Sequence, residues 1–372
     1  MTERRKQAPA GCAHHMLAKT PLFHRFLPEL DPRLAWVALA ELPTPVQRVR
    51  CVGDAQLWIK RDDKTSSEYG GNKTRKLEFS LGEALQQKRT HVVTLGALGT
   101  HHGLATSIFA KKLGLACSII LFDQPPSPHV LQNLLLMHGN GAELIYCRTL
   151  LKAVIHYFAL QRLRRSSSYF LFGGGSNASG TLGYVNAAFE LKQQIDEGQL
   201  PAPDQIFCAF GSGGTLAGLA LGVQLAGLRS RVVGVRIAPA QWGPIPLATP
   251  RHVLSLANKA YQLLVRSGAR LPDVPLEPPT VIDDFLGAGY GHPSAAGREA
   301  ADILRESDGI ELDETYTAKT FAAVLAAARE RSQPDRVLLY WHTLNSVDLE
   351  SRARQIDPLS LPRPFDRFFR HP

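Results

Sequence analysis

The sequence has few cysteines, no long apolar run and no complete phosphate-loop motif, and each absence excludes a class of protein. The five cysteines are scattered without a CxxC pair, which argues against a disulfide framework and fits a reducing compartment. No run of about 18 apolar residues exists, so no membrane-spanning helix is expected. The first residues lack the apolar segment of a secretory signal. We therefore expect a cytoplasmic protein without a membrane partner.

Two features at first suggest other ligands. Cys12, His14 and His15 could bind a metal ion, but no second pair of ligands follows them at the spacing of a zinc site, so we expect no metal. We expect residues 1–15 to be a disordered leader, and Met16 could be the true start.

The net charge of +9 suggests nucleic-acid binding as a possible function. The basic residues are spread out and lack an aromatic stacking motif, so we expect no nucleic-acid partner. A solvated basic surface or a site for anionic small molecules fits as well.

Short apolar runs alternate with helical patterns from residue 56 onward, which predicts an α/β fold with parallel sheets. A chain of 372 residues suggests about two domains. Continuous apolar runs such as CSIILF (117–122) indicate strands buried on both faces. The predicted strands are 57–60, 91–95, 117–122, 143–147, 169–172, 205–210, 231–237 and 337–342. The predicted helices are 74–86, 103–113, 129–139, 149–163, 183–195, 215–227, 250–267, 294–306 and 317–330.

The stretch YGGNKTRKLEF (69–79) contains a lysine whose role has to be decided. A phosphate loop needs a glycine directly before the lysine and another five residues earlier still, but Asn72 and Ser67 hold those positions. Lys73 is therefore either an ordinary surface lysine or a reactive amine. The start of a helix and the neighbouring Arg75 and Lys76 favour a neutral amine and so lower its pKa. Such an amine is suited to bond a carbonyl carbon.

The stretch FGSGGTLAG (210–218) is the strongest local signal for a phosphate site. A buried strand ends, small residues follow, and a helix begins, so backbone N–H groups can face an anion. A dinucleotide site fits poorly, because Leu216 replaces the third glycine of that fingerprint and no acidic residue follows at the required distance. A plain tight turn is the alternative. A single-phosphate cup together with a reactive lysine indicates pyridoxal phosphate.

At this point the chain resembles the D-cysteine desulfhydrase and 1-aminocyclopropane-1-carboxylate (ACC) deaminase family of pyridoxal-phosphate enzymes, within the tryptophan synthase β-like fold type II. The matching stretches occur in family order over roughly residues 40 to 350. They are KRDDKTSSEYGGNKTRKLEF (60–79), TLGALGTHHGLATSIFAKKLGL (94–115), GGSNASGTLGYVNAAFE (174–190), FGSGGTLAGLALG (210–222), DDFLGAGYGHP (283–293), DETYTAKT (313–320) and, more weakly, HTLN (342–345).

The resemblance implies a role for each matching residue. Lys73 would bind the cofactor covalently and, once free, would act in proton transfer with Thr100 and Tyr290. The cofactor would be held by Asn72, His101, Gly211, Ser212, Gly213, Gly214, Thr215 and Thr317, the last facing its pyridine nitrogen. The substrate would be contacted by Thr100, His102, Tyr290 and Tyr316.

Thr317 separates the two activities of the family on physical grounds. A carboxylate at this position keeps the ring nitrogen protonated and makes the cofactor a deep electron sink, which suits the opening of a cyclopropane. A hydroxyl provides a shallower sink, which is enough for removal of an α-proton and expulsion of a thiolate. We therefore expect a carbon–sulfur lyase that releases sulfide, pyruvate and ammonia from a small amino acid, with ACC deaminase as the alternative.

The chain departs from the family in two places. Where the family has Gln-Ser-Asn-His, this chain has Gly99, Thr100, His101 and His102; adjacent histidines can also be one core and one surface residue. Where the family has HTGG, Leu344 and Asn345 replace the glycines and are expected to narrow the pocket. A cofactor-binding homologue with little activity is therefore a second alternative.

The resemblance also implies two α/β lobes with the cofactor between them. We expect a larger unit from residues 1–75 and 184–372 and a smaller one from 76–183. A homodimer is the family expectation.

Overall fold

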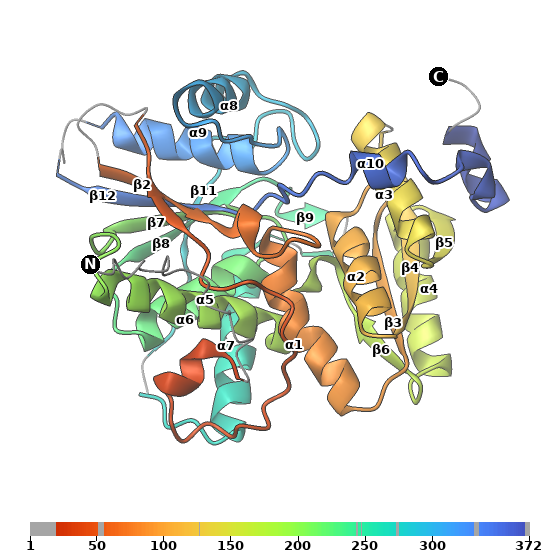
Figure 1. The fold of residues 1–372 in the computed structure, drawn as a ribbon, viewed down its shortest axis with the longest axis horizontal. Helices are drawn as coiled ribbons and strands as arrows, with labels where there is room; N and C mark the ends of the chain where they lie inside the picture. Colours follow the sequence, from red (N-terminus) through yellow and green to blue (C-terminus); the bar gives the residue numbers. More distant parts are fainter. Residues whose placement is uncertain are drawn as a thin grey trace, which may run out of the picture.

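The computed structural model describes residues 20–50, 56–125, 127–242, 245–246, 248–272, 275–330 and 335–368. The expected leader 1–15 and Met16 lie outside these residues. Within them the chain forms a mixed α/β fold built on two sheets that lie side by side (Figure 1).

The larger sheet has the strand order β1-β2-β12-β7-β8-β11. Only β1 is antiparallel to its neighbour; the other pairs are parallel. Its strands are β1 (Val46–Arg48), β2 (Gln56–Arg61), β7 (Gln205–Phe210), β8 (Arg231–Arg236), β11 (Thr280–Ile282) and β12 (Val337–His342). The edge strands β1 and β11 escape sequence-based prediction because each has only three residues.

The smaller sheet has the order β5-β4-β3-β6 and is parallel throughout. Its strands are β3 (His91–Ala97), β4 (Ala116–Phe122), β5 (Glu143–Arg148) and β6 (Ser168–Leu171). A separate short ribbon pairs β9 (Gln241–Trp242) with β10 (Ile245–Pro246).

Helices cover both faces of each sheet, as the apolar strands predict. The α-helices are α1 (Asn72–Gln86), α2 (His101–Lys112), α3 (Pro128–Gly139), α4 (Leu150–Leu163), α5 (Ala178–Asp196), α6 (Gly214–Leu225), α7 (Pro250–Arg266), α8 (Ala295–Asp308), α9 (Thr317–Ala328) and α10 (Glu350–Ala353). The 3-10 helices are η1 (Leu22–Arg25), η2 (Asp62–Lys64), η3 (Gly173–Gly175), η4 (Pro358–Ser360) and η5 (Arg363–Phe368).

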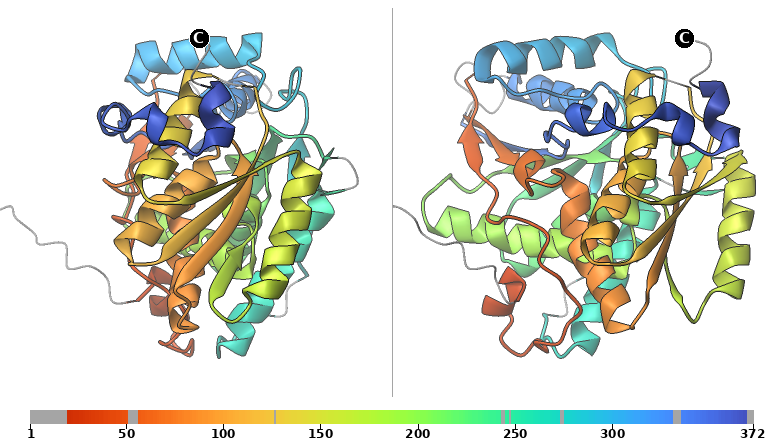
Figure 2. Two further views of the ribbon diagram at one scale, coloured as in Figure 1. Left: turned by 90° about the vertical axis from the view of Figure 1, so that its right-hand side faces the viewer. Right: turned by 45° about the vertical axis from the view of Figure 1, so that its right-hand side comes forward.

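Alternate residues of a strand enter different cores, because successive side chains point to opposite faces. Leu339 and Trp341 of β12 join the core under α5, α6 and α7, whereas Leu338 and Tyr340 join the core under α8 and α9. The smaller sheet divides in the same way: one core lies under α1, α2 and α3, and another lies under α4 (Figure 2).

The strands, two helices and the C-terminal segment can be placed relative to the proposed division of the chain. All strands of the smaller sheet lie within 76–183, but α1 and α5 each run across one of the proposed boundaries. In addition, Leu349, Ala353 and Phe365 pack into the core of the smaller unit beside α3, although the proposal assigns 184–372 to the larger one (Figure 1). We keep the division as a proposal and place this C-terminal segment against the smaller unit.

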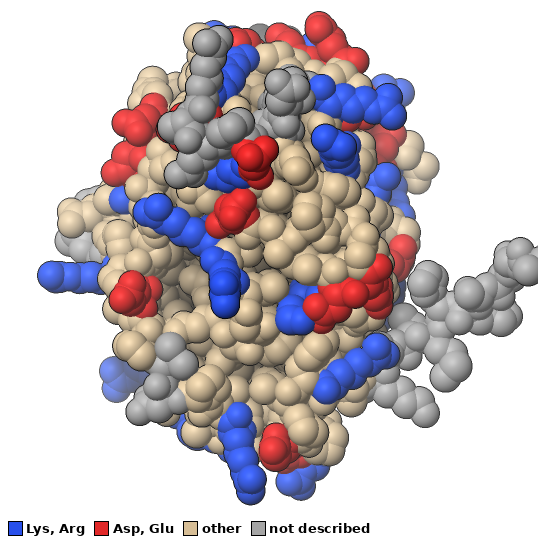
Figure 3. Space-filling model, turned by 90° about the vertical axis from the view of Figure 1, so that its left-hand side faces the viewer, with Lys and Arg blue, Asp and Glu red and all other residues tan. Residues whose placement is uncertain are grey.

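The distribution of surface charge and the hydropathy of the helices bear on the expectation of no nucleic-acid and no membrane partner. On the face drawn in Figure 3, basic and acidic side chains are interleaved and no continuous basic patch forms. No helix in the described ranges is both long and apolar enough to span a bilayer. Among the same residues, no group of three or more metal-ligating side chains comes together.

Candidate active site

A cavity of about 220 Å³ opens between the two sheets at the carboxyl ends of β3, β6, β7 and β12. The structure brings the sequence-predicted site residues together there, although they come from segments far apart in the chain. The lining includes Asn72, Lys73, Thr100, His101, His102, Gly211, Ser212, Gly213, Thr215, Tyr290, Tyr316 and Thr317. Gly214 lies just behind the lining, where its N–H donates to Ser176 Oγ at 3.1 Å.

Lys73 is the second residue of α1 and reaches the cavity because the chain turns sharply before it. Gly71 has a φ of +84°, and a Cβ on it would lie 2.7 Å from the carbonyl oxygens of Thr343 and Leu344. Only glycine is suited to both requirements. The turn sets the half-buried Lys73 against the cavity, and burial lowers the pKa of its amine to about 8.

The lowered pKa of Lys73 agrees with the sequence argument, and burial is its main cause. The guanidinium of Arg75 turns away from the cavity and is neutralised by Asp62 at 2.7 Å and Glu190 at 2.9 Å. Burial and the neighbouring Lys73 lower the pKa of the Lys76 amine well below its usual value.

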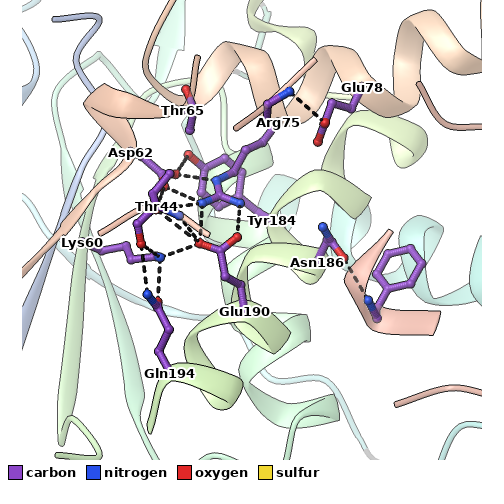
Figure 4. A network of polar contacts seen from close by, with 12 residues as sticks. Thr44, Lys60, Asp62, Thr65, Arg75, Glu78, Tyr184, Asn186, Glu190 and Gln194 are labelled. Atoms are coloured by element: carbon purple, nitrogen blue, oxygen red, sulfur yellow. Dashed lines mark hydrogen bonds and ion pairs between the residues drawn. The ribbon is translucent and has the colours of Figure 1, made fainter. Parts of the chain in front are cut away.

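Arg75 belongs to a buried ionic cluster that anchors α1 to the larger unit (Figure 4). Asp62 follows β2, Glu190 lies on α5, and Lys60 Nζ lies 2.5 Å from Glu190 Oε1. Two cations face two anions, so the formal charges balance. Thr44, Gln194, Tyr184 and Trp341 complete the hydrogen bonds of the cluster. The helix α1, which carries Lys73, is thereby held against the larger sheet and α5.

Two glycine-rich loops face each other at one end of the cavity. One is the predicted loop 211–215, where Gly213 has a φ of +86° directly before α6. The other is 173–176, which the sequence indicated only as a turn; Ser176 Oγ lies 2.8 Å from Ser212 Oγ. Asn72 Nδ2 donates to Thr215 Oγ1 at 3.1 Å and so links the start of α1, next to Lys73, to the loop 211–215.

Lys76 adds an amine to this group of loops and was not predicted as a site residue. Its Nζ donates to the Gly174 carbonyl at 3.4 Å, and it would lie 3.1 Å from a Cβ built on Gly214. It is 1% exposed. A buried amine between two glycine loops and a helix N-terminus favours an anionic group, whose charge would raise the pKa of the amine. The arrangement suits a phosphate.

The turn after β3 and the first residues of α2 place three predicted residues, Thr100, His101 and His102, against the cavity. Thr100 caps α2, since its Oγ1 accepts from Gly103 N at 3.2 Å, and its hydroxyl proton stays available. The methyl group of Thr100, which a serine would lack, fits because the neighbouring Gly96 and Gly103 have no side chains. His102 is 3% exposed, and neither ring nitrogen has a protein partner within the described ranges. A buried imidazole without partners is expected to meet a ligand.

The opposite wall carries the predicted aromatic residues and Thr317. The hydroxyls of Tyr290 and Tyr316 contact each other. Thr317 Oγ1 donates to Asp313 Oδ1 at 2.7 Å and accepts from Asp313 N at 2.7 Å. Asp313, which the sequence did not single out, also accepts N–H groups at the start of α9. Because the hydroxyl proton of Thr317 points to Asp313, Thr317 can only accept a hydrogen bond from a group in the cavity. The Asp313 carboxylate lies on the other side of that hydroxyl.

Leu344 and Asn345, which were expected to narrow the pocket, lie next to the backbone turn that precedes Lys73. Asn345 Oδ1 accepts from Gly70 N at 2.7 Å and from Val347 N at 3.2 Å. Leu344 lines the cavity together with Asn345. Asn345 thus holds the loop that precedes Lys73, and the cavity remains open beside it.

Comparisons with known proteins agree with this site. Residues 37–342 match the model of the family described as pyridoxal-phosphate dependent enzyme. The chain is 31% identical over 328 residues to a putative 1-aminocyclopropane-1-carboxylate deaminase of Thermotoga maritima, covering 86% of this chain and 99% of that protein. It is 32% identical to a D-cysteine desulfhydrase of Serratia proteamaculans, covering 84% and 93%.

A solved structure gives the same indication. The crystal structure of an ACC deaminase homologue aligns with a TM-score of 0.73 at 29% identity and covers 90% of this chain and 98% of its own.

Proposed function

The chain belongs to the family of pyridoxal-phosphate-dependent enzymes, in its ACC deaminase and D-cysteine desulfhydrase group, and we propose that it cleaves the carbon–sulfur bond of D-cysteine. The balanced reaction converts D-cysteine and water into pyruvate, ammonia and hydrogen sulfide. The observation that carries the choice is the hydroxyl of Thr317, which faces the cavity where ring opening would call for a carboxylate.

The residues present fit pyridoxal phosphate. The two glycine loops and Lys76 would hold the phosphate, and Lys73 would bind the aldehyde carbon. Thr317 would face the ring nitrogen, and Asn72 would contact a remaining polar atom. His101, expected from the sequence to bind the cofactor, lines the cavity, but its two ring nitrogens already lie 3.0 Å from the Tyr69 hydroxyl and 3.1 Å from His129 Nε2. When bound, the cofactor supplies an electron sink for the charge that develops at the substrate's Cα.

The protein's own groups would handle the substrate and its protons. The Lys73 amine, with a pKa of about 8, changes protonation near neutral pH and is suited to take the α-proton. The hydroxyl proton of Thr100 is free to contact the substrate carboxylate or to share in this transfer. His102, which lacks a protein partner within the described ranges, would donate to the carboxylate, and Tyr290 and Tyr316 would orient the substrate.

The rival activity, ring opening of ACC, gains some support from Asp313. Its carboxylate lies behind Thr317 and gives that oxygen more acceptor strength than an isolated hydroxyl has. However, the carboxylate oxygens also accept the backbone N–H groups of Thr315, Tyr316 and Thr317, so the same carboxylate also holds the start of α9. We therefore retain elimination as the proposal.

A product assay on the purified enzyme loaded with cofactor tests the proposal. Sulfide and pyruvate should form from D-cysteine, and a Lys73→Ala variant should release neither above background. Formation of 2-oxobutyrate from ACC in their place would identify a deaminase. A protein that binds the cofactor but yields no product from D-cysteine, L-cysteine or ACC would refute the proposed activity and support the low-activity homologue. We also propose a homodimer, which light scattering on the purified protein checks.

A further inference from the structure

A continuous chain of hydrogen bonds leads from the cavity to the protein surface. The hydroxyl of Tyr69 lies 3.0 Å from His101 Nδ1. On the other side of the same ring, His101 Nε2 lies 3.1 Å from His129 Nε2. Tyr69 is 1% exposed and lines the cavity together with His101, whereas His129, in the first turn of α3, is exposed. The chain thus joins the site to solvent through two imidazoles.

Asn133 determines which atoms carry the protons. One N–H of its amide donates to the Gly99 carbonyl at 2.9 Å, which identifies the amide nitrogen, and the other donates to His129 Nε2 at 3.2 Å. His129 Nε2 is therefore an acceptor whose one lone pair is shared between Asn133 and His101, and its proton sits on Nδ1. It follows that His101 Nε2 donates to His129 and that His101 Nδ1 accepts from the Tyr69 hydroxyl. Every donor in the chain points the same way, from the cavity toward solvent.

We propose that His101 and His129 form a proton relay, with Tyr69 as its inner end, that exchanges protons between the active site and solvent. The hydrogen-bond chain itself does not depend on the reaction catalysed. Its use in turnover rests on the proposed elimination, in which one proton leaves the substrate's Cα and another is later delivered to the three-carbon product.

Each step of the relay balances. A proton released onto the Tyr69 oxygen displaces the phenolic proton to His101 Nδ1. The proton on His101 Nε2 then moves to His129 Nε2, and the proton on His129 Nδ1 passes to water. One proton leaves, every group stays neutral, and the reverse shift restores the starting arrangement when the product is protonated. Neither imidazole needs to leave its place.

Burial and the neighbouring charges lower the pKa of both imidazoles. The pKa of His101 falls to about 4 because the ring is buried, with His129 and Lys73 acting in the same direction and Asp313 against them. Burial also lowers the pKa of His129, again against Asp313. The ring of Tyr316 packs edge-on against His101. At acid pH a protonated His129 would carry a proton on Nε2 opposite the proton on His101 Nε2, and the relay would be interrupted.

The first test reads the proton positions without any turnover. Nitrogen-15 spectra of the imidazole rings in the cofactor-loaded protein near pH 7.5 should show His101 protonated on Nε2 and His129 on Nδ1. A His129→Gln variant should shift the His101 ring signals. His138→Gln, in the last turn of the same helix, should not. Protonation of His101 on Nδ1 would overturn the proposal, as would His101 signals that do not respond to His129→Gln.

The second test measures turnover. Because a positioned acid–base group contributes about 100-fold or more and water can replace part of a relay, we expect His129→Gln to lower kcat for D-cysteine by about tenfold. KM and the visible absorbance of the bound cofactor should stay unchanged, and added imidazole should restore rate. His138→Gln should behave as wild type. An unchanged kcat, or a loss that imidazole does not restore, would refute the relay.

The two tests separate the relay from the proposed activity. If the wild-type protein releases no sulfide, the activity proposal fails, and the proton positions still decide whether the relay exists. If His129→Gln lowers the urea midpoint, the smaller substitution His129→Asn is measured with the same imidazole rescue. A loss that imidazole reverses in either variant supports the relay, and a loss that it reverses in neither contradicts it.

Discussion

Replacement of Arg75 by methionine tests how the lysine helix is held in place. Arg75 is fully buried and donates to Asp62 at 2.7 and 2.9 Å, to Glu190 at 2.9 and 3.0 Å and to Thr44 at 3.0 Å. Methionine fills much of the same volume but leaves two buried carboxylates with Lys60 as the one cation of the cluster. Breaking a buried ion pair from one side costs about 3–5 kcal/mol, and we expect a loss in this range.

The pH dependence of that loss distinguishes charge from packing. Arg75 and Lys60 hold the pKa of Glu190 at about 2 against the opposing effect of burial. This depressed pKa contributes stability above the unfolded value of about 4.3, and the contribution is lost as pH falls toward 2. The variant lacks most of this contribution, so its deficit should be large at pH 7 and should shrink below pH 4.

Urea unfolding followed by tryptophan fluorescence measures this deficit directly, because Trp341 donates to Asp62 at 2.6 Å within the cluster. Arg329→Met removes an exposed arginine whose partner Glu299 lies at 3.4 Å, and it should cost less than about 1 kcal/mol. The double variant Arg75→Met/Glu190→Gln restores one cation to one anion and should be more stable than Arg75→Met alone. A loss below about 1 kcal/mol at pH 7, or one that does not vary with pH, would refute the reasoning.

Three further predictions concern the site itself. Gly71→Ala should weaken cofactor binding and destabilise the protein by clearly more than Gly114→Ala, because both positions have positive φ but only Gly71 has carbonyl oxygens 2.7 Å from the new Cβ; equal urea midpoints would contradict this. Lys76→Met should raise the Kd for pyridoxal phosphate by roughly ten- to a hundredfold in a titration, whereas exposed Lys112→Met should not. The rate of cofactor attachment should rise with pH through about 8 and then level off, since only the neutral amine of Lys73 reacts; a midpoint above about 10, as for an ordinary lysine, would contradict the role of burial.

The parts of the fold that could be predicted are those that a local pattern encodes. Buried parallel strands read as continuous apolar runs, and the loops that follow them carry the small and polar residues of the site, so the cavity could be placed at the strand ends. The order of strands in each sheet, and the packing of the C-terminal segment on the smaller unit, could not be predicted from such runs. These features depend on contacts between distant segments.

The missed site residues share the same physical reason. Lys76 was noted only as a charge next to Lys73, and nothing local shows that it lies between two glycine loops. Asp313 had no visible role until Thr317 and the start of α9 were seen to share its carboxylate. His129 lies 28 positions after His101 and is related to it only through the packing of α2 and α3. A glycine run directly after a buried strand, as at 173–175, was the one signal that could have been used.

The attachment site of the cofactor tests the central claim most directly. Borohydride reduction of the purified enzyme fixes the cofactor on the lysine that holds it, and mass spectrometry of the peptides identifies that residue. Lys73 competes with Lys76, whose amine is also buried and of lowered pKa but is engaged with the Gly174 carbonyl at 3.4 Å. The account predicts modification of Lys73, with none in a Lys73→Ala variant. Modification of Lys76, or of no lysine, would contradict it.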